Sequence, residues 1–242
     1  MALSTRRRLL AGSALFGVAA AFPAAARTIA GAMPWNPNEA YPPSPVLPGR
    51  YLFFRPEEAA AVDALVARLV PNDELGPGAK EAGVTTFIDR QLAGPYGGHD
   101  WLYMQGPFPA NPLPSQGLQS PVVPRDGYRQ GLAALAEYCR STYSGKVFAD
   151  LPPAEQDKVL TGLEKGEVKI KDGRAFFDLL LANTMEGFFS DPIYGGNRDM
   201  VGWKLVGFPG TRYDYRDVMA KPNQPYTLPP VAIGGQPAWG NR

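Results

Sequence analysis

The residues best suited to chemistry in this chain are a single histidine, a single cysteine and a glycine-rich stretch near the C-terminal end. His99 stands in the sequence GGHDW, and Cys139 stands in an apolar segment. One histidine and one cysteine cannot supply the ligands of an ordinary zinc site, an iron–sulfur cluster or a haem attachment. A Ser-His-Asp arrangement would have to use His99, and the chain has no G-x-S-x-G sequence. The usual catalytic and metal-binding groups are therefore scarce.

The glycine-rich stretch DPIYGGNRDMVGWKLVGFPG covers residues 191–210 and looks at first like an active-site loop. Its segment GNRDMVGWK departs from the phosphate-binding pattern G-x-x-x-x-G-K-[ST], because the glycines stand one residue too far apart and Trp203 precedes Lys204. Two interpretations stay open: a recognition surface, since Tyr, Trp and Arg are enriched at interfaces, or a tight loop packed on the chain's own core. The candidate residues are Asp191, Tyr194, Asn197, Arg198, Asp199 and Trp203.

Glu186 and Cys139 are two further candidates for a structural or functional role. Glu186 lies inside an apolar segment, where a buried carboxylate would need a partner, and Arg198 is a candidate for an ion pair with it. Such a buried pair would be structural or, alternatively, would serve as a general acid or base. Cys139 has no second cysteine in the chain, so it is either a buried thiol or one half of a disulfide to another chain.

Helical periodicity predicts the elements that must position these residues. We expect about five helices, near residues 56–70, 84–93, 125–143, 153–165 and 174–190. The last of them is apolar on most of its circumference and should be the central helix. WKLVGF, within the glycine-rich stretch, could form a short strand. The prediction is an all-α fold with long irregular arms rich in proline and glycine.

One face of the third helix and one long loop carry the clearest packing signals. Tyr128, Leu132, Leu135 and Cys139 form a single apolar stripe. Residues 94–124 lack a periodic pattern, and a loop of this length in a compact domain is usually functional or wraps something. The loop's aromatic residues must pack on this domain or on a partner; they are Tyr96, Trp101, Tyr103 and Phe108.

Residues 1–26 have the features of an export signal. Arg6 and Arg7 precede an apolar run of about 14 residues, which is short for a bilayer span, and Ala24-Ala25-Ala26 fits a cleavage site. The arginine pair resembles a twin-arginine signal, and an ordinary secretory signal with a basic start is the alternative. Whether the signal is removed stays open.

Charge and composition divide the rest of the chain. Without Arg6, Arg7 and Arg8, the chain has 21 Lys and Arg residues against 23 Asp and Glu residues, so its net charge is slightly negative. A protein that binds nucleic acid or anionic lipid would be expected to carry an excess of positive charge instead. We expect an extended proline-rich arm at residues 27–54, a helical domain at 55–217 and an extended tail at 218–242.

Three segments resemble one family, the small subunit of flavin-dependent membrane-bound sugar and sugar-acid dehydrogenases, called gluconate 2-dehydrogenase subunit 3. They are LVPNDELGPGAKEAGVTTFIDRQLAGPYG at 69–97, YRQGLAALAEYC at 128–139 and NTMEGFFSDPIYGGNRDMVGWKLVGFPG at 183–210. The resemblance covers roughly residues 50–217. It implies a chain whose arms wrap a large partner subunit and which has no catalytic, cofactor-binding or metal-binding residue of its own.

The resemblance also implies partners and a location. FAD, an iron–sulfur cluster and haem c would lie in partner subunits, namely a flavoprotein large subunit and a cytochrome c subunit. The twin-arginine translocation machinery would export the small and large subunits together to the periplasmic face of the inner membrane. Family members often have cysteine at the position of Cys139, which implies an interchain disulfide to the large subunit.

Two other functions stay open. The chain could be a stand-alone exported enzyme, such as a hydrolase, that uses Glu186, Arg198 or His99. It could also be a periplasmic binding or scaffold protein whose proline-rich arms grip a ligand. The substrate of a partner dehydrogenase cannot be read from this chain, since the substrate contacts would lie in the large subunit.

Overall fold

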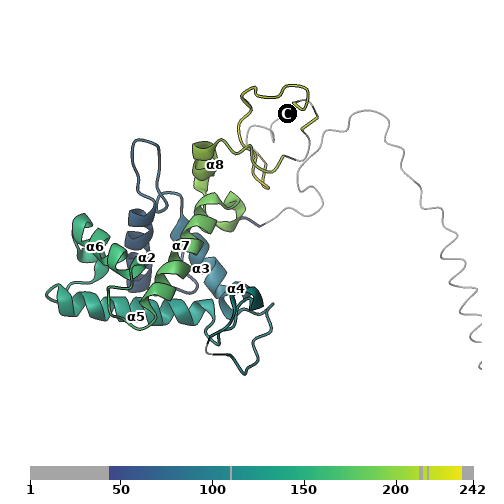
Figure 1. Ribbon diagram of the computed structural model, residues 1–242. Coiled ribbons are helices and arrows are strands. Elements are labelled where there is room, and N and C mark those ends of the chain that lie inside the picture. The colour runs from purple at the N-terminus through teal and green to yellow at the C-terminus, as the bar shows by residue number, and fades with distance from the viewer. Residues whose placement is uncertain (1–43, 110, 213–214, 217, 236–242) are drawn as a thin grey trace, which may run out of the picture. The chain divides into compact units, whose positions relative to one another are not determined.

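The computed structural model describes residues 44–109, 111–212, 215–216 and 218–235 (Figure 1). The chain divides into two units, residues 1–36 and 37–242, and every described residue belongs to the second. In these residues the regular structure is helical, and strand-like pairing is limited to isolated bridges. The prediction of an all-α fold is confirmed. The predicted signal at residues 1–26 lies outside the described residues.

Seven α-helices are present in the described part of the chain. They are α2 (Pro56–Leu69), α3 (Val84–Ala93), α4 (Pro95–Gly98), α5 (Pro124–Thr142), α6 (Pro153–Glu164), α7 (Gly173–Phe189) and α8 (Val201–Val206). Short 3-10 turns lie at Pro114–Gln116, Phe148–Asp150, Pro192–Tyr194 and Arg198–Met200. Proline occupies the first position of α2, α4, α5 and α6, where its missing N–H costs nothing and its fixed φ suits a helix.

Two short helices, α4 and α8, were not predicted, because four and six residues are too few to show a period. The expected strand at WKLVGF is wrong, since its first four residues belong to α8. Gly207 ends that helix with a φ of 69°, the left-handed conformation that commonly terminates helices.

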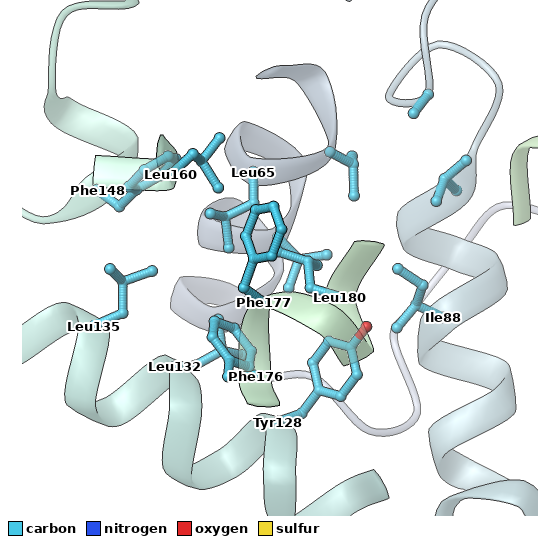
Figure 2. Close-up of a cluster of buried hydrophobic side chains, with 14 of the residues drawn as sticks. Leu65, Ile88, Tyr128, Leu132, Leu135, Phe148, Leu160, Phe176, Phe177 and Leu180 are labelled. Atoms are coloured by element: carbon cyan, nitrogen blue, oxygen red, sulfur yellow. The ribbon is translucent and has the colours of Figure 1, made fainter. Parts of the chain in front are cut away.

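Helix α7 is the central helix, as its apolar circumference predicted. It contacts α2, α3, α5, α6 and α8 (Figure 1). The stripe Tyr128, Leu132, Leu135 and Cys139 of α5 is buried, as predicted. Tyr128 meets Phe176 of α7 edge to face, with ring centroids 5.9 Å apart (Figure 2). A Cβ atom at Gly131 would overlap the Phe176 ring, so this glycine permits the close approach of α5 and α7.

The last residues of the expected proline-rich arm belong to the helical body. Asp89 of α3 is fully buried, and its carboxylate accepts hydrogen bonds from the backbone N–H groups of Leu52, Phe53 and Phe54 at 2.8–2.9 Å. The Arg90 guanidinium also donates to it. These four donors compensate the cost of burying a charge. The Phe54 side chain also lies in the core, so the residues just before α2 pack with the helices.

A second contact fastens the same segment from the other side. The Arg129 guanidinium of α5 donates to the Phe53 carbonyl oxygen at 2.6 Å and lies 4.0 Å from the centroid of the Phe53 ring. It also pairs with the Glu58 carboxylate at the start of α2. The segment before α2 is therefore held by α3 and α5 together.

Candidate functional site

The glycine-rich stretch after α7 folds into a turn that buried polar groups hold in place. Asn197 is fully buried and adopts a left-handed backbone with a φ of 43°, a conformation that asparagine tolerates. Its Nδ2 atom donates to the Ser190 carbonyl oxygen at 2.7 Å, and its Oδ1 atom accepts from the Gly202 N–H at 2.8 Å. One side chain thus joins the end of α7 to the start of α8.

Trp203 completes this junction. Its ring is buried, its Nε1–H donates to the Phe189 carbonyl oxygen at 2.7 Å, and its ring meets Phe208 edge to face at 5.2 Å. Phe189 is the last residue of α7, so the indole satisfies a carbonyl that the helix leaves free. Of the two aromatic candidates in this stretch, Trp203 is buried, whereas Tyr194 is 49% exposed.

The same turn holds both irregular ends of the described chain. Asp191 is buried; its Oδ1 atom accepts from the Ile193 N–H at 3.0 Å, and its Oδ2 atom accepts from the Ile233 N–H at 2.7 Å. The Val46 N–H, in turn, donates to the Ile193 carbonyl oxygen at 2.9 Å. Val231 pairs with residues 209–211 alongside. The turn is therefore an anchor for the N-terminal arm and the C-terminal tail.

The expected buried ion pair between Glu186 and Arg198 is not formed. Both residues are exposed, and no ion pair between them is present among the described residues. Glu186 accepts a hydrogen bond from Asn183 Nδ2 at 2.9 Å, and the Arg198 backbone N–H donates to the Ala82 carbonyl oxygen at 2.9 Å. The prediction is wrong because this end of α7 has an open side, on which Met185 is also exposed.

A buried polar network that sequence reasoning missed lies deeper in α7. The Tyr128 hydroxyl donates to Asn183 Oδ1 at 3.1 Å, and Asn183 Nδ2 donates to the Tyr96 hydroxyl at 2.8 Å. Burial raises the pKa of both tyrosines, so both hydroxyls stay protonated at neutral pH. The network links α4, α5 and α7. An isolated asparagine in an apolar helix was the one available signal for it.

His99 lines an apolar cavity, here called the α5–α7 pocket, with a volume of about 430 Å³ and walls from α5, α7 and the loop before α5. Its lining includes Tyr96, Val123, Gln130, Phe176 and Leu179. The Nδ1 atom of His99 is buried and has no hydrogen-bond partner among the described residues. Burial lowers the pKa of His99, so the imidazole is neutral at pH 7. The described side chains provide no carboxylate hydrogen-bonded to it.

A long loop connects α4 to α5 (Figure 1). It leaves several large apolar side chains in water. Tyr96, which lies in α4, packs against the core, whereas Trp101 and Tyr103 of the loop are 80% and 82% exposed. Other exposed apolar residues of the loop are Leu102, Leu113, Leu118 and Val122. So many exposed apolar side chains in one loop are typical of an interaction site.

Cys139 lies in the core of α5 and is a free, fully buried thiol. Burial raises its pKa to about 11, so the thiolate that forms disulfides is scarce at neutral pH. A bond to another chain would require α5 to open. The structure therefore favours the buried thiol over the interchain disulfide.

The described residues contain no group of three or more His, Cys, Asp and Glu side chains placed to hold a metal ion. Within the same residues, no helix combines the length and the apolar character needed to cross a membrane.

A family model described as gluconate 2-dehydrogenase subunit 3 matches residues 56–210. The match begins at the first residue of α2, includes α8 and ends with the glycine-rich stretch. Neither the curated proteins nor the solved structures that were searched contain a match to the chain.

Proposed function

Since the chain belongs to the gluconate 2-dehydrogenase subunit 3 family, we propose that it is the non-catalytic small subunit of a membrane-bound, FAD-dependent dehydrogenase of sugars, sugar acids or polyols. The family match carries the proposal, because it spans every described helix. The two residues best suited to catalysis support it: Cys139 is buried with a raised pKa, and the described residues offer no hydrogen-bond partner to the Nδ1 atom of His99.

The role that suits this fold is to bind and support another subunit. The loop with Trp101 and Tyr103 offers apolar surface for a protein interface. In the proposed complex, a flavoprotein large subunit holds FAD and an iron–sulfur cluster, and a cytochrome c subunit holds haem c. The small subunit binds the large one and assists its folding.

Export is the second part of the proposed role. The twin-arginine-like signal with Arg6 and Arg7 would carry the folded pair through the translocation machinery. The complex would then lie at the periplasmic face of the inner membrane, attached through the cytochrome subunit.

Co-expression tests both parts. The large subunit should co-purify with this chain, and it should be missing from the periplasm when this chain is omitted. Replacing Arg6 and Arg7 by lysine should keep both chains in the cytoplasm. Equal dehydrogenase activity in the periplasm without this chain would refute the role. Hydrolase activity of the isolated chain would favour a stand-alone enzyme instead.

A further inference from the structure

The α5–α7 pocket and the exposed loop beside it form one surface, and we propose that this surface is the socket into which the flavoprotein large subunit inserts an apolar side chain. The inference rests on the proposed function, which supplies the partner. It adds which face of the chain is used and which chemistry recognises the partner.

The pocket has the walls and the volume needed to hold a large side chain. Its floor and walls come from two long helices, through Gln130 of α5 and Ala175, Phe176 and Leu179 of α7. These helices pack closely because of Gly131, so the walls are rigid. A volume of about 430 Å³ lies near the lower end of the roughly 300–1,000 Å³ typical of binding pockets. That is room for a large side chain and part of its neighbours.

The surroundings of the pocket favour a protein over a small molecule. Trp101 and Tyr103 stand two and four residues after His99 in the chain, and each is about four-fifths exposed. Leu118 and Val122 line the pocket and are themselves exposed. A small ligand inside the pocket would leave Trp101 and Tyr103 in water. A protein surface can cover them, and tryptophan and tyrosine are the residues that most often dominate such interfaces.

His99 gives the socket a polar contact. Its buried Nδ1 atom lacks a hydrogen-bond partner within the described residues, which costs free energy in the isolated chain. A hydroxyl or N–H group of the large subunit that enters the pocket would satisfy this atom. The apolar anchor and this single hydrogen bond would together fix the orientation of the incoming segment.

The charges around the socket argue against a lipid surface. The charged residues that line the pocket are Lys171 and Asp172, and those that adjoin its lining residues in sequence are Asp100, Arg125, Asp126, Arg129, Arg174 and Asp178. Four acids balanced by four bases give no attraction to anionic lipid, which binds surfaces rich in lysine and arginine. The same mixture is ordinary for the rim of a protein interface.

A competition inside one cell tests the socket. Tagged large subunit is co-expressed with equal amounts of wild-type and variant small subunit, and mass spectrometry gives the ratio captured. In the variant Ala175→Phe, an exposed residue that lines the pocket gains an aromatic ring that can occupy part of it. Ala182→Phe makes the same change on an exposed position of α7 outside the pocket lining. We expect Ala175→Phe to be captured at least tenfold less than wild type and Ala182→Phe about equally.

Further measurements separate the other outcomes. Trp101→Ala should also lose at least tenfold in capture, and thermal unfolding of each isolated variant shows that the fold is kept. Equal capture of Ala175→Phe and Trp101→Ala with wild type overturns the socket but leaves the proposed function standing. Failure to capture even the wild-type chain overturns the proposed function and the socket with it. If Trp101→Ala is captured normally but loses binding to phosphatidylglycerol vesicles, the surface faces lipid and the socket is wrong.

Discussion

The Asp191 carboxylate accepts a hydrogen bond at 2.7 Å from the backbone N–H of Ile233, which lies 42 residues further along the chain. The other oxygen of Asp191 accepts from Ile193, whose carbonyl oxygen holds the Val46 N–H. One buried acid and one turn therefore fix both irregular ends of the described chain. The glycine-rich stretch is a structural anchor.

Asp191→Asn should loosen the C-terminal tail. In this variant, the side-chain NH₂ group replaces one of the two acceptor oxygens and opposes a backbone N–H donor. We therefore expect the free energy of unfolding to fall by about 1–3 kcal/mol. Urea denaturation measures that loss, and amide exchange at Ile233 should become faster. Asp199→Asn is the matched control, because Asp199 is exposed and its left-handed backbone suits asparagine. Equal stability of the two variants would show that the tail does not depend on Asp191.

Asp89→Asn should release the segment before α2. Asparagine keeps one acceptor oxygen, which can still serve Phe53 and Phe54, but its NH₂ group would oppose the donors of Leu52 and Arg90. The expected cost is about 1.5–3 kcal/mol, as for lost hydrogen bonds to a charged group.

Urea denaturation gives the stability of this variant, and hydrogen exchange should accelerate more at Leu52 than at Phe54. Asp100→Asn, at an exposed acid, should change stability by less than about 0.5 kcal/mol. A similarly small effect for Asp89→Asn would contradict the proposed anchoring of the segment.

Sequence periodicity predicted the helices that carry the core. The stripe of α5 and the central position of α7 follow from apolar spacing alone, because burial repeats with the helical period. Helices α4 and α8 escaped prediction because neither is long enough for such a repeat. The expected ion pair of Glu186 failed for a related reason: an almost wholly apolar helix does not reveal which of its sides stays open.

The buried polar residues could not be predicted as partners. Asp89 and Asn197 bond to backbone groups, and every residue except proline has a backbone N–H, so no residue type marks the partner. Asn183 bonds to two tyrosines far away in sequence. Only the packed helices bring these groups together. The sequence pointed to Asn197 through its glycine-rich surroundings, and Asp89 gave no signal at all.

Cys139 should resist thiol reagents in the folded chain. Burial raises its pKa from an ordinary value near 9 to about 11, so at pH 8 both access and thiolate are lacking. The folded state holds the proton more tightly than the unfolded state. The stability that this proton contributes is present below pH 9 and is lost as the pH rises toward 11.

Ellman's reagent should therefore react with Cys139 at pH 8 only after denaturant is added. On a non-reducing gel, the small and large subunits of the purified complex should separate without reductant. A band of the combined mass that disappears on reduction would restore the interchain disulfide. If such a band appears, Cys139→Ser should abolish it when the bond is made by this thiol, and should leave it unchanged when the bond joins two other chains of the complex.

Trp203→Ala should be the most damaging single change in the glycine-rich stretch. It removes a buried ring and leaves the Phe189 carbonyl oxygen without its donor, for an expected cost of about 3–5 kcal/mol. Trp203→Phe keeps an aromatic ring in place and loses mainly the hydrogen bond, so it should cost about 1–3 kcal/mol. Trp101→Ala makes the same truncation at an exposed tryptophan and should leave stability within about 0.5 kcal/mol of wild type. Thermal and urea unfolding of the three variants would rank them in that order if Trp203 fastens α8 to α7. If Trp203→Ala were no less stable than Trp101→Ala, the junction would have to be held by Asn197 alone.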